Sequence, residues 1–361
     1  MDKISSYPLY FKFSNILIGI IGFVFIMSVG QSIIVPVIFS IIIAILLNPL
    51  VNFLTKRKIN RVVSISIAVI LALLFALGLI YFIASQMAMF SEALPQLKQK
   101  FLAMFDQAEL WISKRFNIST KKIDDWINTQ KKEGMNNSTS VIGETLSTVG
   151  GLFVMIFLVP VYVFLFLFYK PLLLEFIHKI FPAKDDKTVN EVLTEVKTLV
   201  QSYLVGLMIE ASIVTTLNTT GLLIIGIDYA ILIGIIGALL NLIPYIGGIV
   251  ATLLPVTLAI ATKEPIHALY VVLLYSSVQL IDNNFIVPKI VASKVKINAL
   301  VSIIIVLVGG AIWGVAGMFL SLPLIGICKV IFDRVEHLKP IGFLIGDNMP
   351  DTYIFKKKLK K

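Results

Sequence analysis

Charged residues are scarce in this chain. Asp, Glu, Lys and Arg make up only 14% of its 361 residues, while 58% are hydrophobic and the mean hydropathy is +0.94. Soluble domains usually carry about 25% charged residues. The shortage excludes an ordinary soluble domain. It predicts an all-α membrane protein that crosses the bilayer several times, because a helix satisfies its backbone polar groups internally.

Residues and motifs that support catalysis are also missing. Cys328 is the single cysteine, which excludes a disulfide framework and a cysteine-based zinc site, and the three histidines show no metal-ligand spacing. There is no Gly-x-x-x-x-Gly-Lys-Ser/Thr loop for ATP, no His-Glu-x-x-His and no Gly-x-Ser-x-Gly. We therefore expect no catalytic residue, no metal, no cofactor and no enzyme activity.

Negative charge is in deficit, and the formal net charge is +10. The basic residues gather beside apolar segments, in the loop from Lys56 to Arg61, around Lys289 and in the tail 356–361. No basic run is interleaved with aromatic residues, so nucleic acid is not an expected partner. Basic loops of a membrane protein lie on the cytoplasmic side. We therefore expect an inner-membrane protein, with the lipid bilayer as partner and both termini cytoplasmic.

Six apolar stretches have the length and composition of full membrane spans. They cover roughly residues 15–29, 33–54, 62–84, 151–169, 204–225 and 266–287.

Two further apolar stretches, 229–261 and 297–328, are too long for one span and too short for two. Glycine and proline interrupt both in the middle. Loop charge places both ends of the first stretch outside and both ends of the second inside. We predict two re-entrant hairpins that enter from opposite sides as an inverted repeat, a pattern that points to a transporter's binding site. A single crossing by each stretch is the alternative.

The region 91–148 is a polar insert placed outside the membrane by this topology. Apolar residues recur at helical spacing from Leu97 to Trp111, which predicts a small extramembrane helix. The expected segments are spans one to three (1–90), the polar helical insert (91–148), span four with cytoplasmic amphipathic helices (149–203), a transport core (204–335) and a basic cytoplasmic tail (336–361).

Polar side chains inside the apolar segments are the candidate binding residues. An ionised group at mid-bilayer costs about 2.5–3.5 kcal/mol, and such groups usually face a cavity. The candidates for binding a solute or ion are Glu210, Asn241, Gln279, Asp282 and Asn283. The alternatives without a binding role place Glu210 near the cytoplasmic surface of the membrane and Asp282 at a helix end that leaves the membrane at Pro288.

The expected hairpin tips and hinges are glycines and prolines, with one tyrosine. They are Pro244, Tyr245, Gly247, Gly248, Pro288, Gly309, Gly310, Gly314 and Gly317. Exposed backbone groups at such a tip can bind a small polar ligand. A tight turn without a ligand, or close helix packing at the second tip, is the alternative. A polar stripe from Thr215 to Thr220 is interpreted as structural, because hydroxyl groups often bond to their own helix.

Several short motifs, in order along nearly the whole chain, carry a family resemblance. They are Leu47-Asn48-Pro49-Leu50, Val159-Pro160-Val161-Tyr162, Tyr203-Leu204-x-Gly206, Ile243-Pro244-Tyr245-Ile246-Gly247, Asp282-Asn283-Asn284 with Pro288-Lys289, and Gly314-x-x-Gly317 with Pro323. With these motifs the chain resembles the autoinducer-2 exporter family of bacterial membrane proteins. Ala299 follows Asn298 where a proline is common in the family pattern, so the turn there is expected to differ.

The resemblance implies a transporter with several membrane spans that forms a homo-oligomer, with a pentamer as the suggested number. It suggests export of autoinducer-2 or a similar small polar solute. Because the chain has no ATP-binding loop, we expect transport to be secondary, with the substrate site between the hairpin tips and alternating access as the mechanism. Other family members resemble sodium/proton antiporters, so a monovalent cation/proton antiporter is the first alternative. A non-transporting membrane scaffold, recruiting partners through the insert and the tail, is the alternative of another class.

Overall fold

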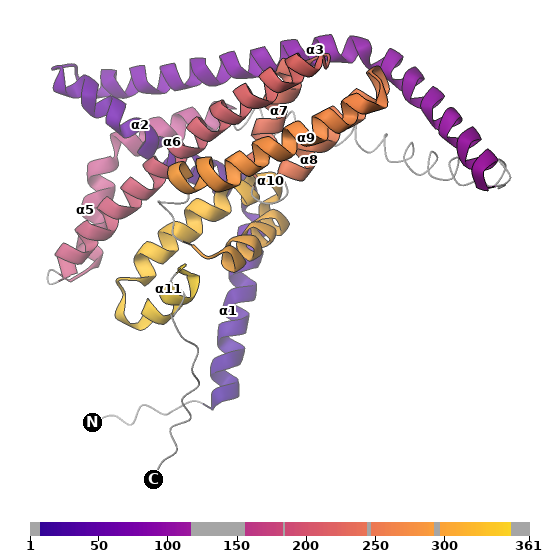
Figure 1. The fold of residues 1–361 in the computed structure, drawn as a ribbon. Helices are drawn as coiled ribbons and strands as arrows, with labels where there is room; N and C mark the ends of the chain where they lie inside the picture. Colours follow the sequence, from indigo (N-terminus) through magenta and orange to yellow (C-terminus); the bar gives the residue numbers. More distant parts are fainter. Residues whose placement is uncertain (1–7, 117–155, 183–184, 244–246, 292–296, 348–361) are drawn as a thin grey trace. The chain divides into compact units, whose positions relative to one another are not determined.

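The computed structural model describes residues 8–116, 156–182, 185–243, 247–291 and 297–347. Within these ranges the secondary structure is helical, apart from one isolated bridge between Ile297 and Gly346 (Figure 1). Among the described residues, five helices are long and apolar enough to cross a membrane, or six if one bent pair counts as a span. The expectation of an all-α, multi-pass membrane protein is therefore confirmed at this level.

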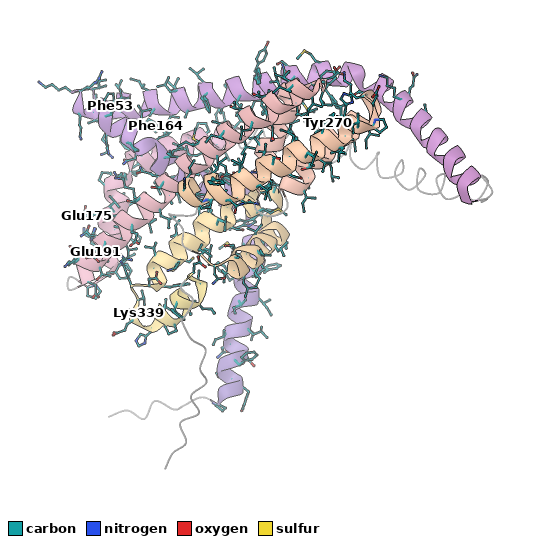
Figure 2. All side chains as sticks on the ribbon, viewed as in Figure 1. Phe53, Phe164, Glu175, Glu191, Tyr270 and Lys339 are labelled. Atoms are coloured by element: carbon teal, nitrogen blue, oxygen red, sulfur yellow. The ribbon has the colours of Figure 1, made fainter. Side chains whose placement is uncertain are left out.

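The long apolar helices carry many exposed hydrophobic side chains. Phe53 and Tyr270 are about half exposed, at 51% and 47%, and both are labelled in Figure 2. Apolar groups at the surface of a span can face lipid at no cost, whereas in a soluble protein a surface this apolar would be unusual. The exposed side chains therefore agree with the membrane assignment.

The chain divides into two compact units. The first unit comprises Met1–Gln31, Leu173–Ile209 and Phe285–Lys361, and the second comprises Ser32–Leu172 and Glu210–Asn284.

In the second unit, α2 (Gln31–Lys56) and α3 (Arg61–Phe116) pack with the helix Ile156–Phe168. Their shared core consists of Ala44, Val51, Ile65, Ala68, Val163 and Leu167. Helix α3 runs without a break from the predicted third span into the predicted insert. The stretch 97–111 is therefore helical as expected, while residues 117–148 of the insert lie outside the described residues.

Arg61 closes the end of the helix Ile156–Phe168. Its Nη2 donates to the backbone oxygens of Leu167, at 2.9 Å, and Phe168, at 3.2 Å. The last carbonyls of a helix have no partner within the helix, so a cationic donor there stabilises it.

We expect Arg61→Ala to lower the free energy of unfolding by about 1–2 kcal/mol, because two charge-assisted hydrogen bonds are lost. Thermal unfolding of the purified protein measures the change. Arg57→Ala is the matched control: the Arg57 guanidinium lies 4.4 Å from the centre of the Phe53 ring, and its only bond to a helix end among the described residues comes from the backbone N–H, which the substitution keeps. Equal losses from the two variants would contradict the capping role.

The first broken stretch folds into two packed helical arms, α7 (Ala230–Asn241) and α8 (Gly247–Thr262). A left-handed turn precedes α7, with φ of 80° at Gly226 and 59° at Tyr229. The open ends of the two arms share a core that holds Ala230 and Leu258. The arms therefore start and finish at the same end of the pair. Pro244 and Tyr245 at the predicted tip lie outside the described residues.

Helix α9 (Pro265–Ile281) continues directly into a π-helical segment, η2 (Asp282–Val291). The predicted end of this span at Pro288 is wrong, because the helical backbone passes through the proline. In an α-helix a proline ring clashes with the carbonyl four residues earlier. The wider π turn moves that carbonyl away, and such segments are frequent at functional sites.

In the first unit, α10 (Ala299–Phe332) contains the second broken stretch. Its backbone leaves helical geometry at Trp313 and Gly314. At Gly314, φ is 60° and ψ is −143°. Beyond this break the chain folds back against the first arm. The Ser321 hydroxyl shows this, since it donates to the oxygen of Ile305 at 2.9 Å.

Glycine lets the two arms of α10 touch. A Cβ on Gly317 would lie 1.9 Å from the backbone oxygen of Gly309. The break itself is held by Trp313, whose indole N–H donates to the oxygen of Met27 at 2.8 Å. Met27 lies in the last turn of α1 (Leu9–Val29), where carbonyls lack partners within the helix.

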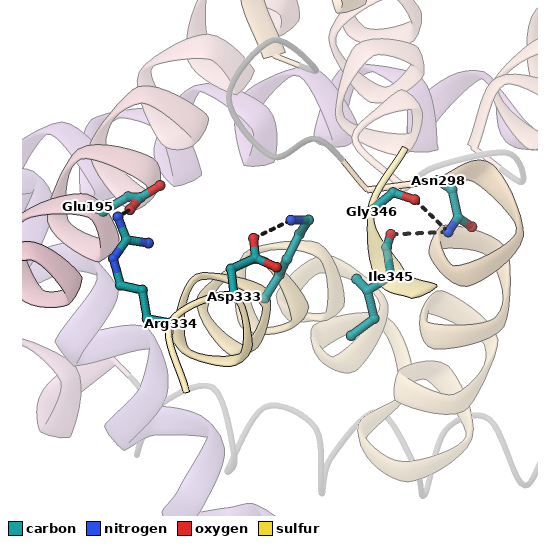
Figure 3. Close-up of polar contacts among 7 residues, drawn as sticks. Glu195, Asn298, Asp333, Arg334, Ile345 and Gly346 are labelled. Carbon is teal, nitrogen blue, oxygen red and sulfur yellow. Dashed lines mark hydrogen bonds and ion pairs between the residues drawn. The ribbon is translucent and has the colours of Figure 1, made fainter. Parts of the chain in front are cut away.

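The two ends of α10 are tied by polar contacts (Figure 3). At its start, Asn298 caps the helix by accepting from the Val301 N–H at 2.9 Å, and its Nδ2 donates to the oxygens of Ile345 and Gly346, at the end of α11 (Lys339–Ile345). At its other end, Arg334 pairs with Glu195 of α6 (Asp186–Ile225). Asn298 thus caps the start of α10 and joins it to the end of α11.

Candidate functional site

The tip of the α7–α8 pair meets the end of α9 through a hydrogen bond. Asn241, the last residue of α7, donates from Nδ2 to Oδ2 of Asp282 at 2.8 Å. Asp282 is 2% exposed, and its Oδ1 has no hydrogen-bond partner among the described residues. Asp282 is therefore buried and does not sit at an exposed helix end.

Glu210 supplies a second acidic group from α6. Its side chain is 4% exposed, and it lies close enough to Asp282 for the two carboxyl groups to interact electrostatically. We call Glu210, Asn241 and Asp282 the carboxylate layer. Two buried carboxyl groups repel one another when both are ionised. The layer therefore favours a ligand that brings positive charge, a proton or hydrogen-bond donors.

Gln279 and Gly248 extend this layer along the tip. A Cβ on Gly248 would lie 2.3 Å from Oε1 of Gln279 and 3.4 Å from Oδ1 of Asn241. The bare glycine therefore lets the first turn of α8 approach the amide side chains. Gln279 also donates to Oδ1 of Asn283 at 3.2 Å, and Asn283 is exposed.

Gly247 permits the tight tip itself. A Cβ there would lie 1.9 Å from the backbone oxygen of Leu240, inside the last turn of α7. No side chain fits in that space, so α8 can begin against α7 only with glycine at this position.

The structure brings together all five predicted binding residues of the second unit, Glu210, Asn241, Gln279, Asp282 and Asn283. Their binding roles stay a prediction. The remaining predicted hinges, Pro288, Gly309, Gly310, Gly314 and Gly317, belong to the first unit.

Sequence reasoning missed three polar residues of the second unit that point inward. Asn218 and Thr219 were assigned to a structural stripe, and Tyr275 was not singled out, yet each has a buried polar atom without a hydrogen-bond partner among the described residues. The spacing of Glu210, Val214 and Asn218 on α6 was a usable signal, because residues four apart share one helix face.

Comparison with known proteins decides the family. The profile of the AI-2E family transporter matches residues 13–337, which is nearly the whole chain. The chain belongs to the AI-2E transporter family. The family is described as one of transporters, which agrees with the long apolar helices among the described residues.

Two relatives match the chain at low identity. YueF of Bacillus subtilis (strain 168) is 24% identical over 228 residues, which cover 63% of this chain and 62% of YueF. AI-2 transport protein TqsA of Escherichia coli (strain K12) is 29% identical over 149 residues, covering 41% of this chain and 43% of TqsA. The chain thus spans less than two thirds of the length of these curated relatives.

Proposed function

We propose that this protein is a secondary transporter of the bacterial inner membrane that exports autoinducer-2 or a similar small polar solute. The hydrogen bond between Asn241 and Asp282 is the observation that carries this proposal. It joins the tip of a helical pair to a buried carboxylate beside a second carboxyl group, Glu210. The similarity to TqsA, whose name contains AI-2 transport, supports the choice of solute.

The proposed membrane arrangement has α7 and α8 entering from the outside as a re-entrant hairpin. The two arms of α10 enter from the cytoplasm, which makes the pair an inverted repeat. Both arm pairs turn back at glycine-rich breaks, and neither α7 nor α8 reaches the roughly 20 residues that a full span needs. Both termini are then cytoplasmic, since basic loops stay inside.

The proposed mechanism is alternating access. Separation of the α7–α8 tip from α9 breaks the Asn241–Asp282 hydrogen bond and opens the carboxylate layer to one side of the membrane. A solute with several hydroxyl groups replaces the lost hydrogen bond, because it donates to Asp282 and accepts from Asn241. The lost contact is thereby compensated in the loaded state, and the solute is released when the tip closes again.

Uptake into sealed liposomes tests the proposal. Purified protein is reconstituted, and the entry of isotopically labelled autoinducer-2 down its own gradient is followed against protein-free liposomes. We expect entry that depends on the protein and saturates with solute concentration. Entry equal to that of protein-free liposomes, at every concentration, would refute transport of this solute.

The pair of buried carboxyl groups favours a second candidate, a monovalent cation/proton antiporter. Glu210 and Asp282 lie within electrostatic reach of each other, as a site that exchanges protons for sodium requires. A pH-sensitive dye inside the liposomes separates the two functions. Antiport predicts proton movement when sodium is added outside, whereas solute export without sodium coupling predicts none.

We also propose that the protein forms a homo-oligomer, with five subunits as the number that the family resemblance suggests. The mass of the detergent-solubilised protein, corrected for bound detergent, measures the number of subunits directly.

A further inference from the structure

Besides Oδ1 of Asp282 and Nδ1 of His267, three buried polar atoms in the second unit have no hydrogen-bond partner among the residues that the structure describes. They are Oδ1 of Asn218, Oγ1 of Thr219 and the hydroxyl oxygen of Tyr275. The Asn218 side chain is 2% exposed and Tyr275 is 5% exposed. Buried polar groups in native proteins are nearly always hydrogen-bonded to protein, water or ligand, so each of these atoms requires an explanation.

Two glycines of α7 bring these side chains to one face. A Cβ on Gly237 would lie 3.1 Å from the Tyr275 hydroxyl and 3.5 Å from Nδ2 of Asn218, and a Cβ on Gly234 would lie 2.2 Å from Oγ1 of Thr219. Residues three apart are neighbours on a helix surface. The polar groups from α6 and α9 therefore converge on the same side of α7. We call Asn218, Thr219 and Tyr275 the second polar layer.

This layer is separate from the carboxylate layer. Asn218 follows Glu210 by eight positions on α6, which corresponds to about 12 Å along the helix axis. Between the two levels, Val214, Ala238 and Val278 form a buried apolar cluster contributed by α6, α7 and α9. The same three helices thus carry a polar level, an apolar level and a second polar level.

An apolar core also closes the far side of the second polar layer. Leu222, Ile233 and Val271 belong to a buried cluster that includes Tyr275 itself. Polar groups shut between two apolar layers cannot exchange with water unless the helices separate. That arrangement is expected of an occluded binding site.

We propose that the second polar layer is an occluded binding site for a small neutral solute that carries hydroxyl groups. The amide and the two hydroxyls both donate and accept hydrogen bonds and carry no charge, so they match hydroxyl groups better than an ion. Val214, Ala238 and Val278 form the gate between this site and the carboxylate layer. The assignment of the solute rests on the proposed transport function, whereas the opening of the layer to water does not.

Tyr275→Phe tests the binding role, because it removes only the unpartnered hydroxyl. Autoinducer-2 uptake into liposomes should require a concentration about five to ten times higher for half-saturation, with the protein folded as the wild type. Tyr270→Phe is the matched control on the exposed face of α9, and it should leave half-saturation unchanged. An unchanged value for Tyr275→Phe would overturn the binding role.

Cysteine accessibility tests the opening of the layer independently of any solute. In a Cys328→Ser background, Thr219→Cys should react with 2-aminoethyl methanethiosulfonate in liposomes. Thr216→Cys is the control, because Thr216 is exposed on the same helix and its hydroxyl donates to the backbone oxygen of Ser212. In the proposed membrane arrangement this position faces lipid, so it should react at least tenfold more slowly.

If Thr219→Cys is no more reactive than Thr216→Cys, the layer stays dry and the proposal fails. If wild-type protein does not take up autoinducer-2, only the proposed solute fails, and this reactivity still decides whether the layer opens.

Discussion

Asp282→Ala is expected to lower the initial rate of solute uptake by about 10- to 100-fold. The substitution removes the buried carboxylate that accepts the hydrogen bond of Asn241 and leaves that amide without its partner. A hydrogen bond to a charged group is worth about 1.5–3 kcal/mol, and 1.4 kcal/mol corresponds to a factor of ten. Uptake of labelled autoinducer-2 into liposomes, normalised to the amount of reconstituted protein, measures the effect.

Asn284→Ala is the matched control for Asp282→Ala. Asn284 belongs to the same polar run, Asp282–Asn284, but it is exposed, and among the described residues its amide donates to the oxygen of Leu280, at 2.8 Å, within its own helix. Its uptake rate should stay within a factor of two of the wild type. Comparable losses from both variants would show that the run acts through helix structure rather than through the Asp282 carboxylate.

Gly247→Ala is expected to destabilise the protein by about 3 kcal/mol and to lower its melting temperature by about 5 °C. The added Cβ would lie 1.9 Å from the backbone oxygen of Leu240 and 2.9 Å from the Cα of Asn241. Both obstacles are backbone atoms, so the clash can be relieved only by moving one arm of the α7–α8 pair. Thermal unfolding of the detergent-purified protein measures the shift.

Gly248→Ala separates a general effect of glycine loss from the specific clash at Gly247. Its Cβ would meet the flexible end of the Gln279 side chain, which can rotate away. We expect a melting temperature near that of the wild type together with slower uptake, because Gln279 is displaced from the tip. A larger thermal loss from Gly248→Ala than from Gly247→Ala would show that the arms do not pack as described.

The sequence predicted the helical elements well because the relevant signals are local. Apolar runs give spans, and the missing side chain of Gly247 and the backbone freedom of Gly314 mark where the chain folds back. The sequence also identified Glu210 and Asp282 as candidate site residues. Placing an ionisable side chain in an apolar membrane segment costs free energy, so such residues usually have a function. These inferences need no knowledge of which helix lies beside which.

The contacts between helices could not be predicted in the same way. The bond from Asn241 to Asp282 joins residues 41 positions apart. It depends on the register between α7 and α9. Short side chains and the geometry of the tip determine this register. The error at Pro288 has a local cause: a π-helical segment has no sequence signature comparable to the strong rule that proline ends an α-helix.

The second polar layer shows why a single helix is insufficient evidence. On α6 alone, Asn218 and Thr219 resemble neighbouring threonines that bond to their own backbone, as Thr216 does. Only the opposing helices distinguish them, because Gly237 admits the Tyr275 hydroxyl close to Asn218. A tyrosine in an apolar helix is usually a core residue, so the sequence did not mark Tyr275 as a candidate site residue.

The central claim is that α7 and α8 enter the membrane and return on the same side. Single cysteines in a Cys328→Ser background test it most directly, with a membrane-impermeant thiol reagent applied to intact cells. If the claim holds, Asp228→Cys and Lys263→Cys, at the two ends of the arm pair, are both labelled from outside, while Arg57→Cys is labelled only after permeabilisation. Labelling of Asp228→Cys and Lys263→Cys from opposite sides would mean that the pair crosses the bilayer, and the claim would be contradicted.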